Sequence, residues 1–137
     1  MTQINTYLTF TGNCREAMCF YQECLGGQLT FQTVGEMAGA GLLPAILTEA
    51  IVQATLQNRY LFLAGSDMVE EEGLVKGNNI SLLLCCDTER EAQDYYWKLV
   101  AGGIATYPLQ KGQEGALWGT LTDKYGHQWL LSTNPHK

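Results

Sequence analysis

"TLQNRY" at residues 55–60 and "TLTDKY" at residues 120–125 are two versions of one short motif in a chain of 137 residues. Each copy lies between apolar segments rich in β-branched and aromatic residues, and each half of the chain carries a double glycine before the motif, at 26–27 and at 102–103. A motif that returns in the same context indicates an internal repeat. Two copies are too few to stack as a solenoid, so the sequence predicts a duplicated module.

The first half predicts one helix among four strands. Asn13 and Glu16 are spaced as in a capping box, and apolar residues follow at helical spacing up to the double glycine at 26–27. Segments with strand-like composition lie at residues 4–10, 28–34, 50–57 and 60–65. The predicted order is βαβββ. "GEMAGAGLLPAIL" (35–47) has no counterpart in the second half, so we interpret it as an inserted mobile flap.

The second half predicts the same order. Thr88 is the expected N-cap of a helix that ends at the double glycine at 102–103. The expected strands lie at residues 79–86, 104–109, 117–123 and 127–133. We therefore expect a single domain over residues 1–137, with module 1 at about 1–67 and module 2 at about 77–137.

The fold class that follows is α+β. Each module offers a four-stranded sheet with one helix on its outer face, which leaves the other face of the sheet to be buried or to enclose a ligand. We expect the two tandem βαβββ modules to form a curved mixed sheet around a cavity.

Composition and charge exclude several classes of partner. The formal net charge is −6 and the eight Lys and Arg residues are scattered, so nucleic acid is not an expected partner. No apolar run approaches the ~20 residues of a membrane span, and the first ten residues do not resemble an export signal. Five cysteines without a CxxC pair are typical of free thiols in a reducing compartment. We expect a cytoplasmic protein that binds neither nucleic acid nor membrane.

Three segments carry a family resemblance: "YLTFTGNCREAMCFYQECLGG" (7–27), "GNNISLLL" (77–84) and "WGTLTDKYGHQW" (118–129). They resemble the PhnB-like branch of the vicinal oxygen chelate superfamily, which includes glyoxalase I, extradiol dioxygenases, and bleomycin and fosfomycin resistance proteins. The resemblance implies a homodimer and a curved sheet that encloses a cavity. The chain shows no methyl-donor fingerprint that would support the methyltransferase description given to similar chains.

Metal-dependent members of that superfamily use four ligands drawn from His, Glu and Gln. The resemblance places these positions at Thr6, Gln53, Asn79 and Leu130. A hydroxyl, two carboxamides and a hydrocarbon offer a divalent cation neither an anionic nor an imidazole ligand. Alternation along the strand puts His127 on the face opposite Leu130. We therefore expect no metal and no other cofactor.

The same alternation predicts which side chains line the cavity. Apolar walls with a few amides and hydroxyls suit a small organic ligand, and Gln53, Asn79 and Ser81 would orient it. A core in which these polar groups satisfy one another is the alternative. The residues predicted to bind the ligand are Thr6, Leu8, Phe10, Gln53, Thr55, Asn79, Ser81, Trp118 and Leu130.

Two further residues are weighed as parts of a site. Cys14 follows the expected N-cap, where the helix dipole favours a thiolate, but no base is near it in the sequence, so an ordinary small residue is the favoured interpretation. Trp129 shares its strand face with Leu131, which predicts packing under a helix.

These observations favour a metal-free protein that binds a small molecule in a cavity of several hundred Å³. Two alternatives remain: a lyase or dioxygenase-type enzyme with an altered metal site, and a structural or regulatory dimer without a ligand.

Overall fold

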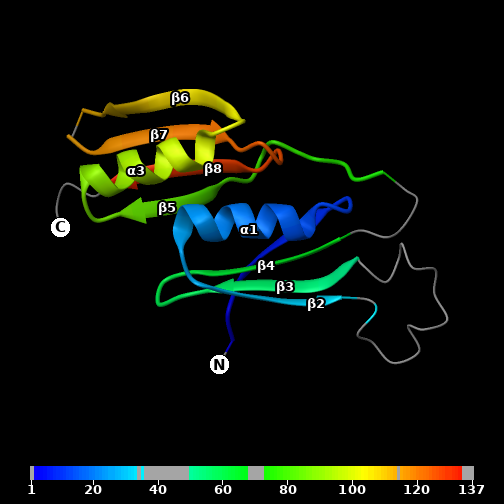
Figure 1. Cartoon of the computed structure of the whole chain (residues 1–137). Coiled ribbons are helices and arrows are strands. Elements are labelled where there is room, and N and C mark those ends of the chain that lie inside the picture. Colours follow the sequence, from blue (N-terminus) through cyan, green and yellow to red (C-terminus); the bar gives the residue numbers. More distant parts are fainter. Residues whose placement is uncertain (1, 34, 36–49, 68–72, 114, 134–137) are drawn as a thin grey trace. The chain divides into compact units, whose positions relative to one another are not determined.

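The computed structural model describes residues 2–33, 35, 50–67, 73–113 and 115–133, and the flap expected at 35–47 lies outside them except for Gly35. The chain divides into two compact units, Met1–Val75 and Lys76–Lys137. Each unit contains one βαβββ module with one four-stranded mixed sheet (Figure 1). The predicted α+β fold and the duplication are confirmed.

The first module runs in the order β1 α1 β2 β3 β4. In its sheet the strands follow the order β1-β4-β3-β2; β1 and β4 are parallel, and the other pairs are antiparallel. The bounds are Thr6–Phe10 for β1, Cys14–Leu25 for α1, Gln28–Thr33 for β2, Ile51–Gln57 for β3 and Phe62–Asp67 for β4.

The second module repeats this topology, with the strand order β5-β8-β7-β6 and a parallel pair of β5 and β8. The bounds are Leu82–Cys86 for β5, Glu89–Val100 for α3, Ile104–Lys111 for β6, Leu117–Thr122 for β7 and Gln128–Thr133 for β8. The strand expected at 79–86 therefore begins three residues later than predicted.

The two helices begin by different means. Thr88 caps α3 as predicted, because its hydroxyl oxygen accepts a hydrogen bond from the Glu91 N–H at 3.1 Å. Asn13 occupies the N-cap position of α1, but its side chain makes no capping bond. A carboxylate oxygen of Asp67, at the end of β4, accepts from the Cys14 N–H at 2.9 Å instead. The predicted capping box at Asn13 is wrong for this reason.

The core of the first module lies between α1 and one face of its sheet. The α1 residues Ala17, Met18 and Tyr21 are fully buried, as are Leu56 of β3 and Leu63 of β4 to within 1%. Side chains at alternate positions of a strand share a face. This alternation fixes which residues of the sheet turn away from the helix.

The core of the second module has the same plan. Ala92 and Leu99 of α3 are fully buried, and Leu131 of β8 is buried with them. The Tyr96 hydroxyl lies 2.8 Å from the Thr120 carbonyl oxygen and therefore links α3 to β7. Trp129 is 3% exposed, and its place in the core confirms the prediction.

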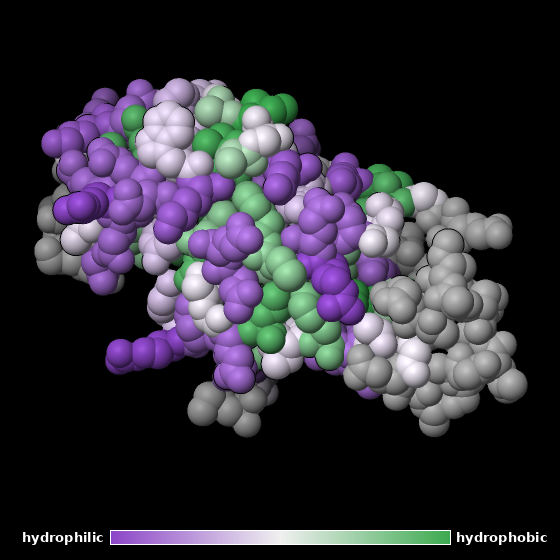
Figure 2. Space-filling view, in the orientation of Figure 1, coloured by the Kyte–Doolittle hydropathy of each residue, from purple (hydrophilic) through white to green (hydrophobic). Residues whose placement is uncertain are grey.

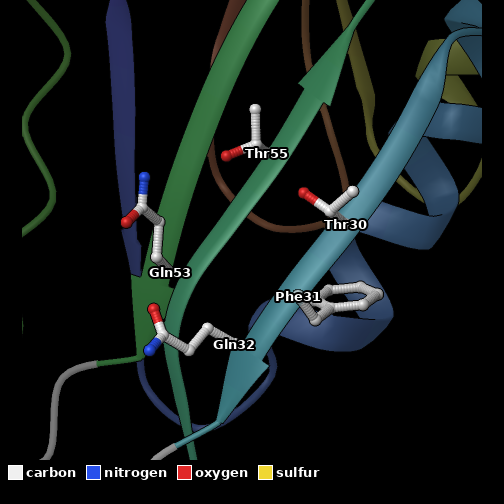
Figure 3. Close-up of a pocket in the computed structure, with 5 residues that line it drawn as sticks. All are labelled: Thr30, Phe31, Gln32, Gln53 and Thr55. Atoms are coloured by element: carbon white, nitrogen blue, oxygen red, sulfur yellow. The ribbon is translucent and has the colours of Figure 1, made fainter.

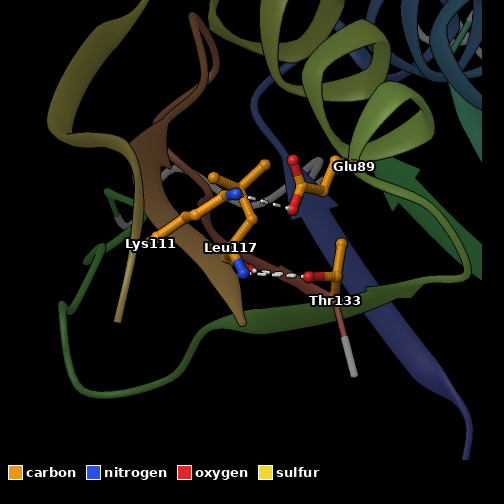
Figure 4. Close-up of polar contacts among 4 residues, drawn as sticks. All are labelled: Glu89, Lys111, Leu117 and Thr133. Atoms are coloured by element: carbon orange, nitrogen blue, oxygen red, sulfur yellow. Dashed lines mark hydrogen bonds and ion pairs between the residues drawn. The ribbon is translucent and has the colours of Figure 1, made fainter. Parts of the chain in front are cut away.

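A hydroxyl joins the ends of β7 and β8. The Thr133 Oγ1 accepts a hydrogen bond from the Leu117 N–H at 2.9 Å (Figure 4). The Lys111–Glu89 ion pair in the same view spans 3.6 Å with both side chains largely exposed. Exposed pairs of this kind contribute about 0–1 kcal/mol, so the buried hydroxyl contact is the more important of the two for stability.

Hydrophilic residues cover much of the face seen in the space-filling view, with smaller apolar patches between them (Figure 2). No helix in the part of the chain that the structure describes is long and apolar enough to cross a membrane.

Candidate functional site

A hollow of about 220 Å³ lies on the first sheet, beside strands β2 and β3. Its lining residues are Thr30, Phe31, Gln32, Gln53 and Thr55. Thr30 is paired with Thr55 across the two antiparallel strands, and Gln32 is paired with Gln53. These four side chains lie on the face of the sheet opposite α1, because Ala54 and Leu56 between them are buried under the helix. We call this face the open face.

None of the described residues that line the hollow is charged. The Phe31 ring extends away from the four polar side chains (Figure 3). On that far side the Arg15 guanidinium lies 4.7 Å from the centre of the ring. A cation within about 6 Å of an aromatic ring is held by the ring's quadrupole. Arg15 is therefore bound on the helix side, and neutral amides and hydroxyls face the hollow.

Three predicted site residues lie on the wrong face. Leu8 and Phe10 are 8% and 2% exposed. A Cβ atom added to Gly65 of β4 would lie 3.1 Å from the Phe10 ring and 3.5 Å from the sulfur of Met18 in α1, so the Phe10 ring lies on the helix side of the sheet. Thr6 shares their strand parity and is paired with the buried Leu63. The predicted order of faces in β1 is wrong because its two apolar residues pack beneath α1.

Two more predicted residues lie outside the strand in which they were expected. Asn79 and Ser81 precede β5 and are exposed. Alternation within a strand therefore does not fix the direction of their side chains. The prediction that they line a sheet face is not supported.

The remaining predicted residues lie on open faces. Gln53 and Thr55 line the hollow. In the second sheet Trp118 is paired with Ser132 and Leu130 with Thr120, on the face opposite the buried Leu131. That these four residues bind a ligand stays a prediction.

The residues at the four metal positions do not fit a divalent cation. Thr6 and Gln53 belong to opposite faces of one sheet, and Leu130 has no donor atom. The part of the chain that the structure describes contains no group of three or more His, Cys, Asp or Glu residues arranged to hold a metal ion. The donor chemistry and the strand geometry therefore argue against the metal site of the superfamily.

Cys14 is not placed to act as a nucleophile. Its side chain is fully buried, and burial together with the nearby Asp67 carboxylate raises the pKa of the thiol to about 12. A thiol with this pKa is protonated at neutral pH and is a poor nucleophile. The effect of desolvation thus exceeds the influence of the helix N-terminus.

His127 belongs to the turn between β7 and β8. Burial lowers the pKa of its imidazole, with a smaller raising effect of Asp123 and a lowering effect of Lys76. Its backbone N–H donates to the Asp123 carboxylate at 3.0 Å. The partly buried imidazole therefore favours its neutral form in the folded chain.

This lowered pKa predicts a loss of stability in mild acid. The unfolded chain binds a proton at His127 near pH 6.5, whereas the folded chain binds it only at lower pH. Stability should therefore fall as pH drops below about 6.5, because protons favour the unfolded state. Urea unfolding between pH 7.5 and 5.5 measures this, with His127→Gln as the matched control. An equally steep decline in the variant would contradict the assignment to His127.

Thr30 and Gln32 are the site residues that the sequence analysis missed. Strand β2 was predicted at 28–34, but its register against β3 was not. The signal was present: residues 28, 30 and 32 are polar and alternate with Leu29 and Phe31. This pattern is typical of a strand with one buried face and one open face.

The second module has different side chains at some of the positions that correspond to the hollow. Trp118 corresponds to Gln53, because each lies two residues before the threonine of the repeated motif. Their cross-strand partners are Gln110 and Gln32. The Tyr107 and Trp118 rings lie 6.0 Å apart between centres. The Thr120 and Thr106 hydroxyl oxygens are 2.6 Å apart. Aromatic rings therefore occupy two of the four polar positions around the hollow, those of Gln53 and Thr30.

Comparison with known proteins agrees with this architecture. Residues 2–132 match the family model described as 3-demethylubiquinone-9 3-methyltransferase. The chain is 26% identical to protein YjdN of Escherichia coli K12 over 137 residues, which covers 94% of this chain and 93% of YjdN. The crystal structure of PA1353 from Pseudomonas aeruginosa is 30% identical, has a TM-score of 0.86 and covers 98% of both chains.

Two further structures extend the comparison. A PhnB protein from Bacillus cereus is 25% identical with a TM-score of 0.77, and the match covers 97% of this chain and 100% of that one. A glyoxalase-related enzyme from Fulvimarina pelagi, at 21% identity and a TM-score of 0.65, shares the fold over 98% of this chain and 90% of its own. With a family model that spans nearly the whole sequence, the chain belongs to the family described as 3-demethylubiquinone-9 3-methyltransferase, is similar to a PhnB protein, and shares the fold of glyoxalase-related proteins.

Proposed function

We propose that the protein binds a small uncharged organic molecule in the hollow of its first module, without a metal ion. The observation that carries this proposal is the lack of hydrogen bonds within the described part of the chain for the four polar side chains around the hollow. Among the described residues, none of the side chains of Thr30, Gln32, Gln53 and Thr55 has a hydrogen-bond partner. A chain that uses these groups neither for folding nor for capping has them available for a ligand.

The chemistry of the hollow suits such a ligand. Two carboxamides and two hydroxyls provide donors and acceptors of both kinds, and the threonine methyl groups provide apolar contact. The hollow of about 220 Å³ is smaller than the ~300–1,000 Å³ clefts of drug-sized ligands. A molecule built on one ring matches this size.

The internal duplication supports the same proposal. Both modules have the same strand topology, yet two of the four polar positions around the hollow, those of Gln53 and Thr30, are occupied by Trp118 and Tyr107 in the second module. Large aromatic side chains at these positions are therefore compatible with the module. Their absence from the first module leaves space for something other than a side chain.

The enzyme alternatives are less well supported. A lyase or dioxygenase of the metal-dependent type needs ligands that Thr6, Gln53, Asn79 and Leu130 do not provide. The sequence contains no glycine-rich methyl-donor loop that would support the methyltransferase description of the family. The homodimer expected from the resemblance, the cytoplasmic location and the ligand-free structural dimer stay predictions.

Replacing Gln53 by Trp tests the proposal with the chain's own second module as the template. We expect Gln53→Trp to fold, because Trp118 occupies the matching position of β7, and to fill the hollow. A library of uncharged one-ring compounds is screened for a rise in melting temperature. Compounds that stabilise the wild type are then titrated by NMR. Their affinity should fall at least about tenfold in Gln53→Trp, a change that corresponds to ~1.4 kcal/mol.

Gln57→Trp is the matched control. Gln57 lies in the same strand on the same face, but it is paired with Gln28 and does not line the hollow. Its replacement should leave the affinities unchanged. Equal affinity of Gln53→Trp and the wild type, or a library without any saturable binder, would refute the proposal.

A further inference from the structure

We infer that the ligand of this hollow carries a neutral lactam-like edge, an N–H donor adjacent to a C=O acceptor, which Gln32 and Gln53 recognise. This inference rests on the proposed function, since it names the class of molecule that the same hollow accepts. It follows from the pairing, the charge and the size of the lining.

The pairing places the two amides side by side. Gln32 and Gln53 are direct cross-strand partners on the open face, and such partners have Cβ atoms about 4.5–5.5 Å apart. In the close-up their side chains lie next to each other at one end of the hollow (Figure 3). A glutamine amide offers one acceptor and two donors in one plane. Each of the two amides therefore presents an acceptor next to a donor.

A planar amide is complementary to a planar edge with the same pair of functions. Glutamine and asparagine recognise adenine in this manner, with two parallel hydrogen bonds to a neighbouring donor and acceptor. A lactam, a cyclic urea or a nucleobase edge has the required pattern. A ketone, an ester or an ether offers acceptors alone and leaves the C=O of the amide without a donor.

The charge of the surroundings argues for a neutral ligand. None of the five lining residues is ionisable, and Arg15 lies against the far side of Phe31. A carboxylate or an ammonium group placed in the hollow would gain no counter-charge from these five side chains. The net charge of −6 further disfavours anions.

The threonine pair of the hollow limits the size and shape of the ligand. Thr30 and Thr55 lie directly opposite each other, two residues along from the glutamine pair. Each threonine presents a hydroxyl and a methyl group. A ring that reaches from the amides to the two threonines would contact their methyl groups and lie beside one or two hydroxyls. This arrangement suits a single ring better than an extended chain.

Three six-membered-ring probes test the inference: δ-valerolactam, δ-valerolactone and cyclohexanone. They have nearly the same shape, but only the lactam has an N–H next to its C=O. Titrations followed by the side-chain amide signals of Gln32 and Gln53 in ¹⁵N-correlated NMR give the dissociation constants. We expect the lactam to bind about tenfold more tightly than the lactone.

Variants assign this preference to the amides. Gln53→Met and Gln32→Met keep the length of the side chain and remove the amide, and both positions are exposed, so the fold should persist. The lactam preference should fall to about onefold to threefold, while cyclohexanone binding is unchanged. Gln57→Met, outside the hollow, should retain the full preference.

The outcomes separate the two proposals. Saturable binding of all three probes with equal affinity would overturn the lactam inference and leave the proposed function standing. A lactam preference that survives both methionine variants would also overturn it. If neither these probes nor any library compound binds the hollow, the proposed function fails as well.

Discussion

Replacing Asp123 by Ala is expected to lower the free energy of unfolding by about 4 kcal/mol. Asp123 is 2% exposed, and both oxygens of its carboxylate accept hydrogen bonds. One oxygen accepts from the Tyr125 and His127 backbone N–H groups at 2.9 and 3.0 Å, and the other accepts from the Trp129 indole N–H at 2.8 Å. Without it these three hydrogen bonds are lost, at about 1–3 kcal/mol for each donor that stays buried and unsatisfied. Urea unfolding of the variant measures the loss.

The first module contains the control for this prediction. Asn58 occupies the matching position in "TLQNRY", and its side-chain oxygen accepts from the Tyr60 N–H at 3.0 Å. Asn58→Ala removes that bond at an exposed site, so we expect a loss of about 1 kcal/mol. Trp129→Phe, which removes a single donor to Asp123, should fall between the two variants. An Asp123→Ala effect no larger than that of Asn58→Ala would contradict the role of the buried carboxylate.

The repeat of this turn is the part of the fold that the sequence predicted best. An Asx residue followed two positions later by tyrosine gives the same local hydrogen bond in both halves, from the Tyr60 N–H and from the Tyr125 N–H. Local chemistry of this kind is visible in the sequence because donor and acceptor are neighbours. The helices were predicted for the same reason, since their apolar spacing and glycine stops are local.

The faces of β1 were predicted wrongly because alternation alone does not say which set of residues meets the helix. Residues 6, 8 and 10 form one set, and Tyr7 and Thr9 form the other. The metal position that the resemblance placed at Thr6 turned the first set toward the cavity. The hydrophobic effect favours the opposite choice, since Leu8 and Phe10 gain more from burial than two residues with hydroxyl groups.

The sequence analysis identified half of the four polar residues of the candidate site. Gln53 and Thr55 were identified from β3, but Thr30 and Gln32 depend on the register between β2 and β3. Residues 36–49, between those strands, lie outside the described part of the chain, and a connection of that length does not determine a register. The hollow is therefore a product of tertiary pairing and not of any single segment.

The long-range cap of α1 leads to the second large prediction: Asp67→Ala is expected to lower the free energy of unfolding by about 3 kcal/mol. One Asp67 oxygen accepts from the Gly12 and Cys14 N–H groups at 3.0 and 2.9 Å, and the other accepts from the Ile51 N–H at 2.9 Å. The side chain thus joins the first turn of α1 and the start of β3 to the end of β4. Urea unfolding and amide hydrogen exchange at Gly12, Cys14 and Ile51 measure the loss.

The second module shows what part of this effect belongs to the helix. Among the described residues, Thr133, at the matching end of β8, accepts from the Leu117 N–H alone, while Thr88 caps α3 locally. Thr133→Val should therefore cost about 1 kcal/mol. Asp67→Thr imitates the second module, so we expect it to protect Ile51 and still release Cys14. Because the Asn13 side chain accepts from Thr11 and not from α1, no local cap replaces Asp67, and the N-terminus of α1 should exchange fastest in both Asp67 variants. Unchanged protection of Cys14 would show that α1 begins without this carboxylate.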